Sequence, residues 1–169
     1  DVVNVPCILY NIPGRTGCSI SPANVERLSK HPNAWGIKEA SGDISYAASI
    51  AHLLSDDFHM LSGNDDMVVP LMSLGATGVI SVWADVAPRT VHDMCAKFLS
   101  GDVAGARKIQ IDNLELVHSL FCEVNPIPVK AALAKMGLIE ENYRKPLWPM
   151  TDADRERLFA AMKGAGIID

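Results

Sequence analysis

The sequence has no long hydrophobic run and no excess of basic charge. Its apolar stretches are interrupted within a few residues by glycine, proline or a charged residue, well short of the roughly 18 apolar residues that span a bilayer. The chain has 15 lysine and arginine residues against 20 aspartate and glutamate residues, for a net charge of −5. We therefore expect neither a membrane nor a nucleic acid as a partner.

Paired cysteines are also lacking, and no basic segment followed by an apolar run, as in a secretion signal, is visible at the start of this sequence. The four cysteines, Cys7, Cys18, Cys95 and Cys122, are scattered and form no CxxC pair. Dispersed thiols in a chain of this length usually behave as small hydrophobic residues in a reducing compartment, which predicts a cytoplasmic protein. The chain starts at Asp1 rather than at a methionine, as a fragment or a trimmed protein does.

Several motifs of common enzyme classes are missing. The five histidines show no HExxH pattern or clustered spacing, and no GxGxxG or P-loop sequence is found. A G-x-S-x-G sequence, which would indicate a serine hydrolase, is absent as well. We therefore expect no metal and no cofactor.

Strand-like and helix-like segments alternate over the first 100 residues. Four short apolar runs of strand length occupy residues 5–10, 34–38, 58–62 and 78–82. Helical patterns lie between and after them, over residues 22–28, 43–54, 65–74 and 88–100, with Ser21 and Asp43 as N-caps. Continuous apolar runs are typical of parallel strands buried on both faces. The alternation predicts an α/β fold, either a small doubly wound sheet or half of an eight-unit barrel.

The remainder of the chain is helical. One long amphipathic pattern covers residues 102–123, and prolines at 126 and 128 interrupt it. A short helix is expected over 129–136, and Thr151 with Asp154 resembles a capping box that begins the last helix. We therefore divide the chain into residues 1–100 and a helical domain, residues 101–169.

Lys38 and Tyr10 each stand at the end of a predicted strand. Lys38 is flanked by Trp35 and Ile37, and partial desolvation there favours the neutral amine that attacks a carbonyl carbon. The phenol of Tyr10 can relay protons during imine formation. The alternative for Lys38 is a lysine at a strand end that points into water.

Three further candidates follow strand ends. Arg15, in a turn with two glycines, can bind a carboxylate through two parallel hydrogen bonds, or it is an ordinary surface arginine. Gly63 and Ile80 lie in segments of small residues that leave room for a ligand. Close packing explains those small residues equally well.

Taken together, the segments that contain these residues resemble those of the dihydrodipicolinate synthase family, whose members are pyruvate-dependent aldolases of lysine biosynthesis. The matching segments keep the family's order and spacing over essentially the whole chain: residues 10–17, 36–42, 61–65, 75–82 and 125–130.

The resemblance implies a fold and an assembly. The family fold is a TIM (β/α)8 barrel with a C-terminal helical extension, usually in a homotetramer. Against that pattern, residues 1–100 carry strands 5–8, the second half of the barrel, and residues 101–169 form the C-terminal helical domain. The first four strands would bring paired threonines and a second tyrosine of the proton relay.

The resemblance also implies roles for the candidate residues. Lys38 would form a Schiff base with pyruvate, and Tyr10 would relay protons. Arg15 would bind the carboxylate of the second substrate, aspartate semialdehyde. Two further residues, Gly63 and Ile80, would line the pyruvate pocket through backbone groups.

Two alternatives to a synthase remain. The related N-acetylneuraminate lyases share the tyrosine and the lysine, but an arginine five residues after the tyrosine is not expected in them, so Arg15 favours the synthase. The second alternative is a non-catalytic half-barrel that only assembles with other subunits. A half-barrel would expose two sheet edges and an apolar inner face.

Overall fold

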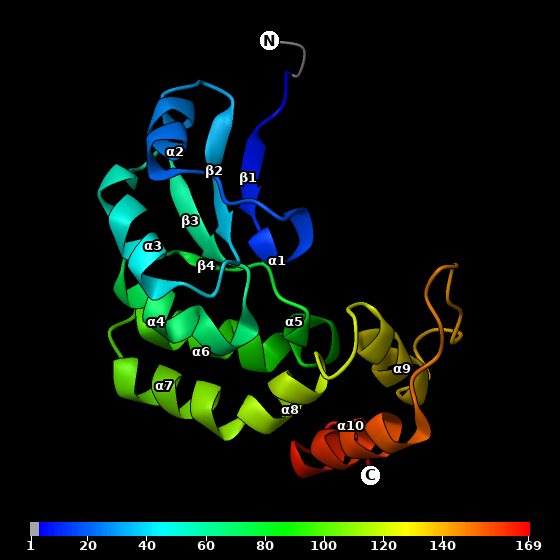
Figure 1. Ribbon diagram of the computed structural model, residues 1–169. Coiled ribbons are helices and arrows are strands. Elements are labelled where there is room, and N and C mark those ends of the chain that lie inside the picture. The colour runs from blue at the N-terminus through cyan, green and yellow to red at the C-terminus, as the bar shows by residue number, and fades with distance from the viewer. Residues whose placement is uncertain (1–3) are drawn as a thin grey trace. The chain divides into compact units, whose positions relative to one another are not determined.

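A four-stranded parallel sheet organises the first part of the chain. The computed structural model describes residues 4–169, and the sheet has the order β1-β2-β3-β4. Its strands are β1 (Cys7–Asn11), β2 (Ala34–Glu39), β3 (His59–Ser62) and β4 (Gly78–Val79). All neighbouring strands are parallel, so their carboxyl ends meet at one edge, the lower edge in Figure 1. The predicted α/β class with a parallel sheet is confirmed.

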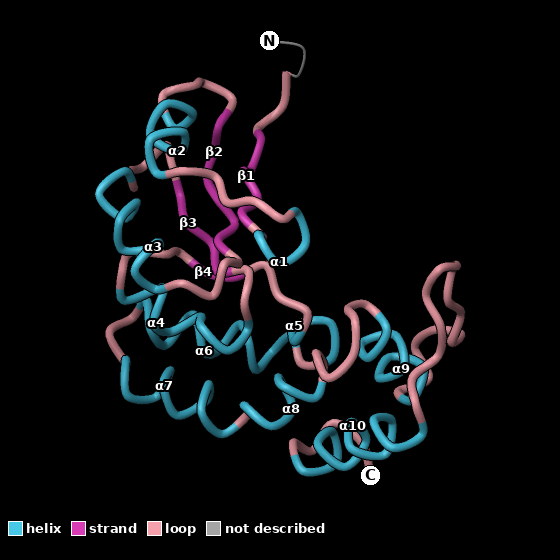
Figure 2. The backbone as a smooth tube through the Cα atoms, in the orientation of Figure 1, coloured by secondary structure: helices cyan, strands magenta, loops and turns pink. Residues whose placement is uncertain are grey.

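Short helices connect the strands. They are α1 (Pro13–Thr16), α2 (Pro22–Ser29), α3 (Ile44–Ile50) and α4 (Val68–Ser73), with 3-10 turns η1 (Ala51–Leu53) and η2 (Asp65–Met67). Helices α2 and α3 lie on the same side of the sheet (Figures 1 and 2). Beneath them, Val25, Ile37, Ala47 and Met60 are fully buried and form the core of this part.

Two predicted helix starts are confirmed. The Ser21 side chain accepts a hydrogen bond from the Asn24 N–H at the start of α2. At α3, Asp43 Oδ1 accepts bonds from two backbone N–H groups, at 2.8 and 3.1 Å. Residues 65–67 form a 3-10 turn, so α4 begins only at Val68. This places Pro70 in the first turn of α4, where a missing N–H leaves no hydrogen bond unmade.

The opposite face of the sheet is only partly covered. Ile8 and Tyr10 are 41% and 46% exposed on it, and the register places Lys38 beside Tyr10 on the same face. Within residues 4–169, the strands are therefore fully covered on one face only, as expected of half a barrel. The α2 and α3 side supplies the buried apolar contacts, and the other face presents a half-exposed surface of mixed character.

The second part of the chain is helical. It contains α5 (Trp83–Val86), α6 (Pro88–Leu99), α7 (Val103–Asp112), α8 (Leu114–Ser119), α9 (Ile127–Lys135) and α10 (Asp152–Gly164). The chain divides into two compact units with the boundary between Ser81 and Val82. The division that we place after residue 100 falls between α6 and α7, and it stays a prediction. Within residues 4–169, no helix is both long enough and apolar enough to cross a membrane.

The single long helix expected over residues 102–123 is wrong. The chain leaves helical geometry at Asn113, whose side-chain Nδ2 donates to the Ile109 carbonyl at 2.8 Å and so satisfies the last turn of α7. Apolar side chains on both sides of this break, Ala106, Val117 and Leu120, are nevertheless buried. A side chain that competes for a backbone carbonyl can end a helix without disturbing its apolar face.

The cap predicted at Thr151 is present in altered form. Thr151 Oγ1 accepts a bond from the Asp154 N–H and donates one to the Asp154 carboxylate. The Thr151 N–H donates instead to Glu123 Oε1 at 2.9 Å. This side-chain bond ties the start of α10 to the segment after α8.

A polypeptide of these 169 residues, made alone, is expected to self-associate. The sheet has two unpaired edge strands, β1 and β4, and a half-exposed face that includes Ile8. Light scattering should detect oligomers or aggregates, and Ile8→Lys should reduce them. Ile44→Lys, at a similarly exposed isoleucine on α3, should have little effect. A wild-type monomer that unfolds cooperatively would contradict this expectation.

Candidate active site

Lys38 and Tyr10 lie side by side at the carboxyl edge of the sheet. They are register partners on β2 and β1, so their side chains leave the same face. Lys38 Nζ lies 4.4 Å from the centroid of the Tyr10 ring, within the range of a cation–π interaction. An aromatic ring thus lies against the amine of this half-exposed lysine.

Gly63 makes room for the stem of Lys38. A Cβ atom at this position would lie 3.0 Å from Lys38 Cε and 2.6 Å from Ala40 Cβ. The second distance is too short for two carbon atoms. A side chain at residue 63 would therefore overlap Ala40 and crowd the stem of Lys38.

The backbone N–H groups of Gly63 and Ile80 are already engaged in the sheet. The Gly63 N–H donates to the Glu39 carbonyl at 2.6 Å, and the Ile80 N–H donates to the Ser62 carbonyl at 2.9 Å. Any backbone group that these two residues present to a ligand is therefore a carbonyl oxygen. The Ile80 side chain is 39% exposed.

Arg15 lies on α1, the single helical turn that directly follows β1. Gly17 ends this turn with φ of 73°, a left-handed conformation that favours glycine, and its N–H donates to the Pro13 carbonyl. Thr16 Oγ1 donates to the Cys18 carbonyl at 2.8 Å. These bonds give the loop its own internal structure, and the Arg15 side chain is exposed on it.

Two buried polar residues that the sequence analysis missed lie next to the candidate residues. Asn11 follows Tyr10 and Glu39 follows Lys38, and they are 1% and 2% exposed. They are register partners on the face opposite to Lys38. Asn11 Nδ2 donates to Glu39 Oε2 at 2.8 Å. A carboxyl and an amide at neighbouring strand ends, one residue after each candidate, were the available signal.

Further bonds extend from this buried pair. Glu39 Oε1 accepts from the Ser41 N–H at 2.6 Å, and Asn11 Oδ1 accepts from the Ile20 N–H at 3.0 Å. The Tyr46 hydroxyl donates to the Ile20 carbonyl at 2.6 Å. Burial, and to a lesser extent the negative charge of Glu39, raises the pKa of Tyr46 to about 12.

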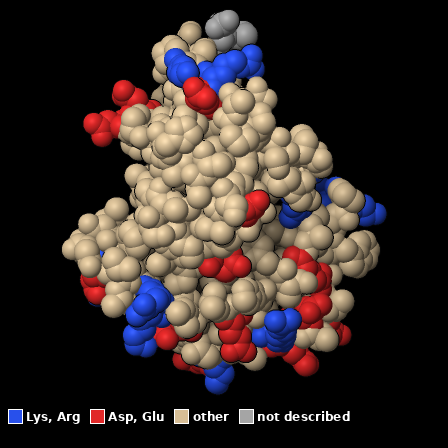
Figure 3. Space-filling view, turned by 60° about the vertical axis from the view of Figure 1, so that its left-hand side comes forward, with Lys and Arg blue, Asp and Glu red and all other residues tan. Residues whose placement is uncertain are grey.

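The structure thus brings three predicted residues, Lys38, Tyr10 and Gly63, into one cluster. Arg15 and Ile80 belong to the segments that follow β1 and β4 at the same edge (Figure 1). Acidic and basic side chains are intermixed on the face in Figure 3. Among residues 4–169, no group of three or more histidine, cysteine, aspartate or glutamate side chains is placed to hold a metal ion.

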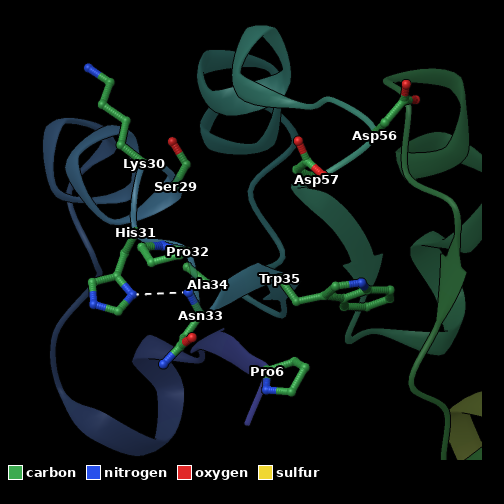
Figure 4. A pocket seen from close by; sticks show the side chains of 10 residues that line it. All are labelled: Pro6, Ser29, Lys30, His31, Pro32, Asn33, Ala34, Trp35, Asp56 and Asp57. Atoms are coloured by element: carbon green, nitrogen blue, oxygen red, sulfur yellow. Dashed lines mark hydrogen bonds between the residues drawn. The ribbon is translucent and has the colours of Figure 1, made fainter. Parts of the chain in front are cut away.

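A separate hollow of about 510 Å³ lies at the amino ends of the strands. Its lining residues are Pro6, Ser29, Lys30, His31, Pro32, Asn33, Ala34, Trp35, Asp56 and Asp57 (Figure 4). None of the predicted site residues lines it. Ligands in parallel α/β sheets bind at the carboxyl ends of the strands, so the Lys38 edge is the stronger candidate.

Comparisons with known proteins agree on one family. The family model described as "Dihydrodipicolinate synthetase family" matches residues 1–165. A 4-hydroxy-tetrahydrodipicolinate synthase of Pseudomonas aeruginosa is 48% identical over 99% of this chain. A protein with the same name from Alkaliphilus oremlandii is 45% identical, also over 99% of the chain. The chain spans 58% of the length of each of these relatives.

Solved structures give the same result. The dihydrodipicolinate synthase of Thermotoga maritima matches with a TM-score of 0.95 and 38% identity, covering 99% of this chain and 58% of that one. A chloride-inhibited dihydrodipicolinate synthase from Acinetobacter baumannii, complexed with pyruvate, matches with a TM-score of 0.93 and 43% identity. That match covers 98% of this chain and 57% of the other.

Replacing Gly63 with alanine is expected to destabilise the protein and displace Lys38. The new methyl group would overlap Ala40 Cβ, and overpacking of this kind costs about 1–3 kcal/mol, or several degrees of Tm. Thermal unfolding of the protein that contains this sequence measures the effect. Gly14→Ala is the matched control, because a Cβ there has no neighbour within 4 Å. Equal Tm values for the two variants would contradict the packing argument.

Proposed function

The chain belongs to the dihydrodipicolinate synthetase family, and from that premise we propose that the whole protein is a 4-hydroxy-tetrahydrodipicolinate synthase. It would condense pyruvate with aspartate semialdehyde in lysine and diaminopimelate biosynthesis. The observation that carries the proposal is the pairing of Lys38 with Tyr10 at the carboxyl edge of the sheet, with Nζ 4.4 Å from the ring centroid.

In the proposed reaction, the neutral amine of Lys38 attacks the keto carbon of pyruvate. Loss of water leaves an imine, in which the lysine nitrogen is doubly bonded to that carbon. A proton then leaves the methyl carbon, and the resulting enamine carbon forms a bond to the aldehyde carbon of the second substrate. The amino group that came with the second substrate then attacks the imine carbon, which closes the ring and releases the amine of Lys38. The position of Lys38 at the carboxyl edge of the sheet supports this role, because ligands of parallel β/α folds bind at that edge.

Tyr10, Gly63 and Ile80 would serve the same step. Tyr10 would accept a proton from the attacking amine and return one to the departing hydroxyl group. Gly63 would keep the space that Lys38 and pyruvate share, and the carbonyl groups of Gly63 and Ile80 would line the pocket. Their engaged N–H groups support this choice of carbonyls.

Arg15 would bind the carboxylate of aspartate semialdehyde. Its guanidinium offers two parallel N–H donors, which suit a carboxylate better than a lysine would. The placement of Arg15 on an ordered, exposed turn directly after β1 supports this role. It also favours the synthase over an N-acetylneuraminate lyase, in which we do not expect this arginine.

The four strands are proposed to be strands 5–8 of a (β/α)8 barrel. The partly covered face that carries Lys38 and Tyr10 would then line the barrel interior, since parallel sheets are normally covered on both faces. Residues 1–100 would complete the second half of the barrel, and residues 101–169 would form the helical extension. A cytoplasmic homotetramer, without a metal or a cofactor, completes the proposal.

Lys38→Ala is expected to abolish imine formation, because no other group in the cluster is an amine. Borohydride reduction in the presence of pyruvate should add mass to the peptide that contains Lys38, and the variant should trap none. Lys30→Ala, at an exposed lysine after α2, should trap pyruvate normally. Full trapping by the Lys38→Ala protein would refute the assignment.

Arg15→Ala is expected to impair use of the aldehyde far more than use of pyruvate. Loss of a bidentate bond to a carboxylate should cost about 2–4 kcal/mol of transition-state stabilisation, which appears as a lower kcat/KM for aspartate semialdehyde. Borohydride trapping of pyruvate should continue at close to the normal rate. Arg27→Ala, at an exposed arginine of α2, is the control. Unchanged kcat and KM for the aldehyde would remove Arg15 from the site.

A further inference from the structure

We propose that Asn11 and Glu39 form a buried brace that positions the Arg15 loop and thereby sets the affinity for the carboxylate of the second substrate. The loop is the segment 12–20. The inference rests on the proposed function, because it assigns the brace to the aldehyde step of that reaction. It names Asn11 and Glu39 as positioning residues, since both side chains leave the sheet on the face opposite to Lys38.

Asn11 closes the loop at its base. Its Oδ1 accepts from the Ile20 N–H at 3.0 Å, so the residue just before the loop is bonded to the last residue of the loop. Its Nδ2 donates to Glu39 Oε2 at 2.8 Å. The amide therefore has one fixed orientation, with its oxygen toward the loop and its nitrogen toward β2.

Glu39 fixes that orientation. The Glu39 carboxylate has only acceptor atoms, and it uses one oxygen for Asn11 and the other for the Ser41 N–H. Glu39 is 2% exposed, so water does not readily replace a lost partner. An unsatisfied polar group at this depth costs more than the hydrogen bond itself contributes.

Tyr46 holds the same point of the loop from another side. Its hydroxyl donates to the Ile20 carbonyl at 2.6 Å, so both backbone groups of Ile20 are bonded to side chains. The loop base is thus fixed by β1, β2 and α3 together. Arg15 stands on the loop between these fixed points, and fixing them in advance lowers the entropic cost of binding its carboxylate.

A donor–acceptor swap tests the brace in the full-length enzyme. Glu39→Gln alone always loses one bond, because its amide offers a single oxygen to two N–H donors. Asn11→Asp alone places two carboxylates in contact. The double variant Asn11→Asp/Glu39→Gln restores all three bonds, with donor and acceptor exchanged and the charge unchanged.

We expect each single variant to raise KM for aspartate semialdehyde about ten- to hundredfold, as loss of a buried bond allows. Borohydride trapping of pyruvate should stay within about twofold of wild type. The double variant should recover most of the aldehyde affinity. The brace would be overturned if pyruvate trapping fell as much as aldehyde affinity, or if the double variant did not recover aldehyde affinity. Either result would leave the proposed synthase in place. A wild-type enzyme that traps no pyruvate would instead refute the synthase.

A milder variant covers the case in which the single variants do not fold. Tyr46→Phe removes only the bond to the Ile20 carbonyl and should raise KM for the aldehyde several-fold. Tyr143→Phe is its control, since the Tyr143 hydroxyl is also part-buried and hydrogen-bonded, to Glu141 Oε1 at 2.9 Å, and burial also raises its pKa to about 12. An unchanged aldehyde KM in the Tyr46→Phe enzyme would contradict the proposal.

Discussion

The parallel pairing of β1 with β2 is the constraint on which the rest of the site depends. It sets Tyr10 opposite Lys38 and, one residue further, Asn11 opposite Glu39. Because successive side chains of a strand leave opposite faces, one pairing produces two different environments. A half-exposed face holds an amine over an aromatic ring, and a buried face holds an amide against a carboxylate.

Close packing then refines what the pairing begins. Residue 63, directly after β3, has no space for a methyl group, because its Cβ would lie 2.6 Å from the Cβ of Ala40, directly after β2. The same packing engages the N–H of that residue with the Glu39 carbonyl. The packing of the two strand ends therefore requires a glycine at residue 63, and this glycine also lies beside the Lys38 side chain.

Local signals in the sequence were sufficient for most of the sheet unit. Apolar runs located the strands, and Ser21 and Asp43 marked helix starts because their side chains bond nearby N–H groups. Long-range pairing was not readable in this way. Asn11 and Glu39 lie 28 residues apart, and their contact can be expected only once the register of β1 against β2 is known. The helix break at Asn113 was missed because the apolar periodicity continues across it.

The alternation along β2 has a consequence for how this protein can change during evolution. An insertion or deletion of one residue within the strand would move the lysine to the helix-covered face and the glutamate to the open one. The lysine would then be lost from the site and the glutamate would no longer support the Arg15 loop, although the apolar content of the strand would hardly change. Length variation is therefore tolerable in the connecting loops but not in β2, where neighbouring positions serve different purposes.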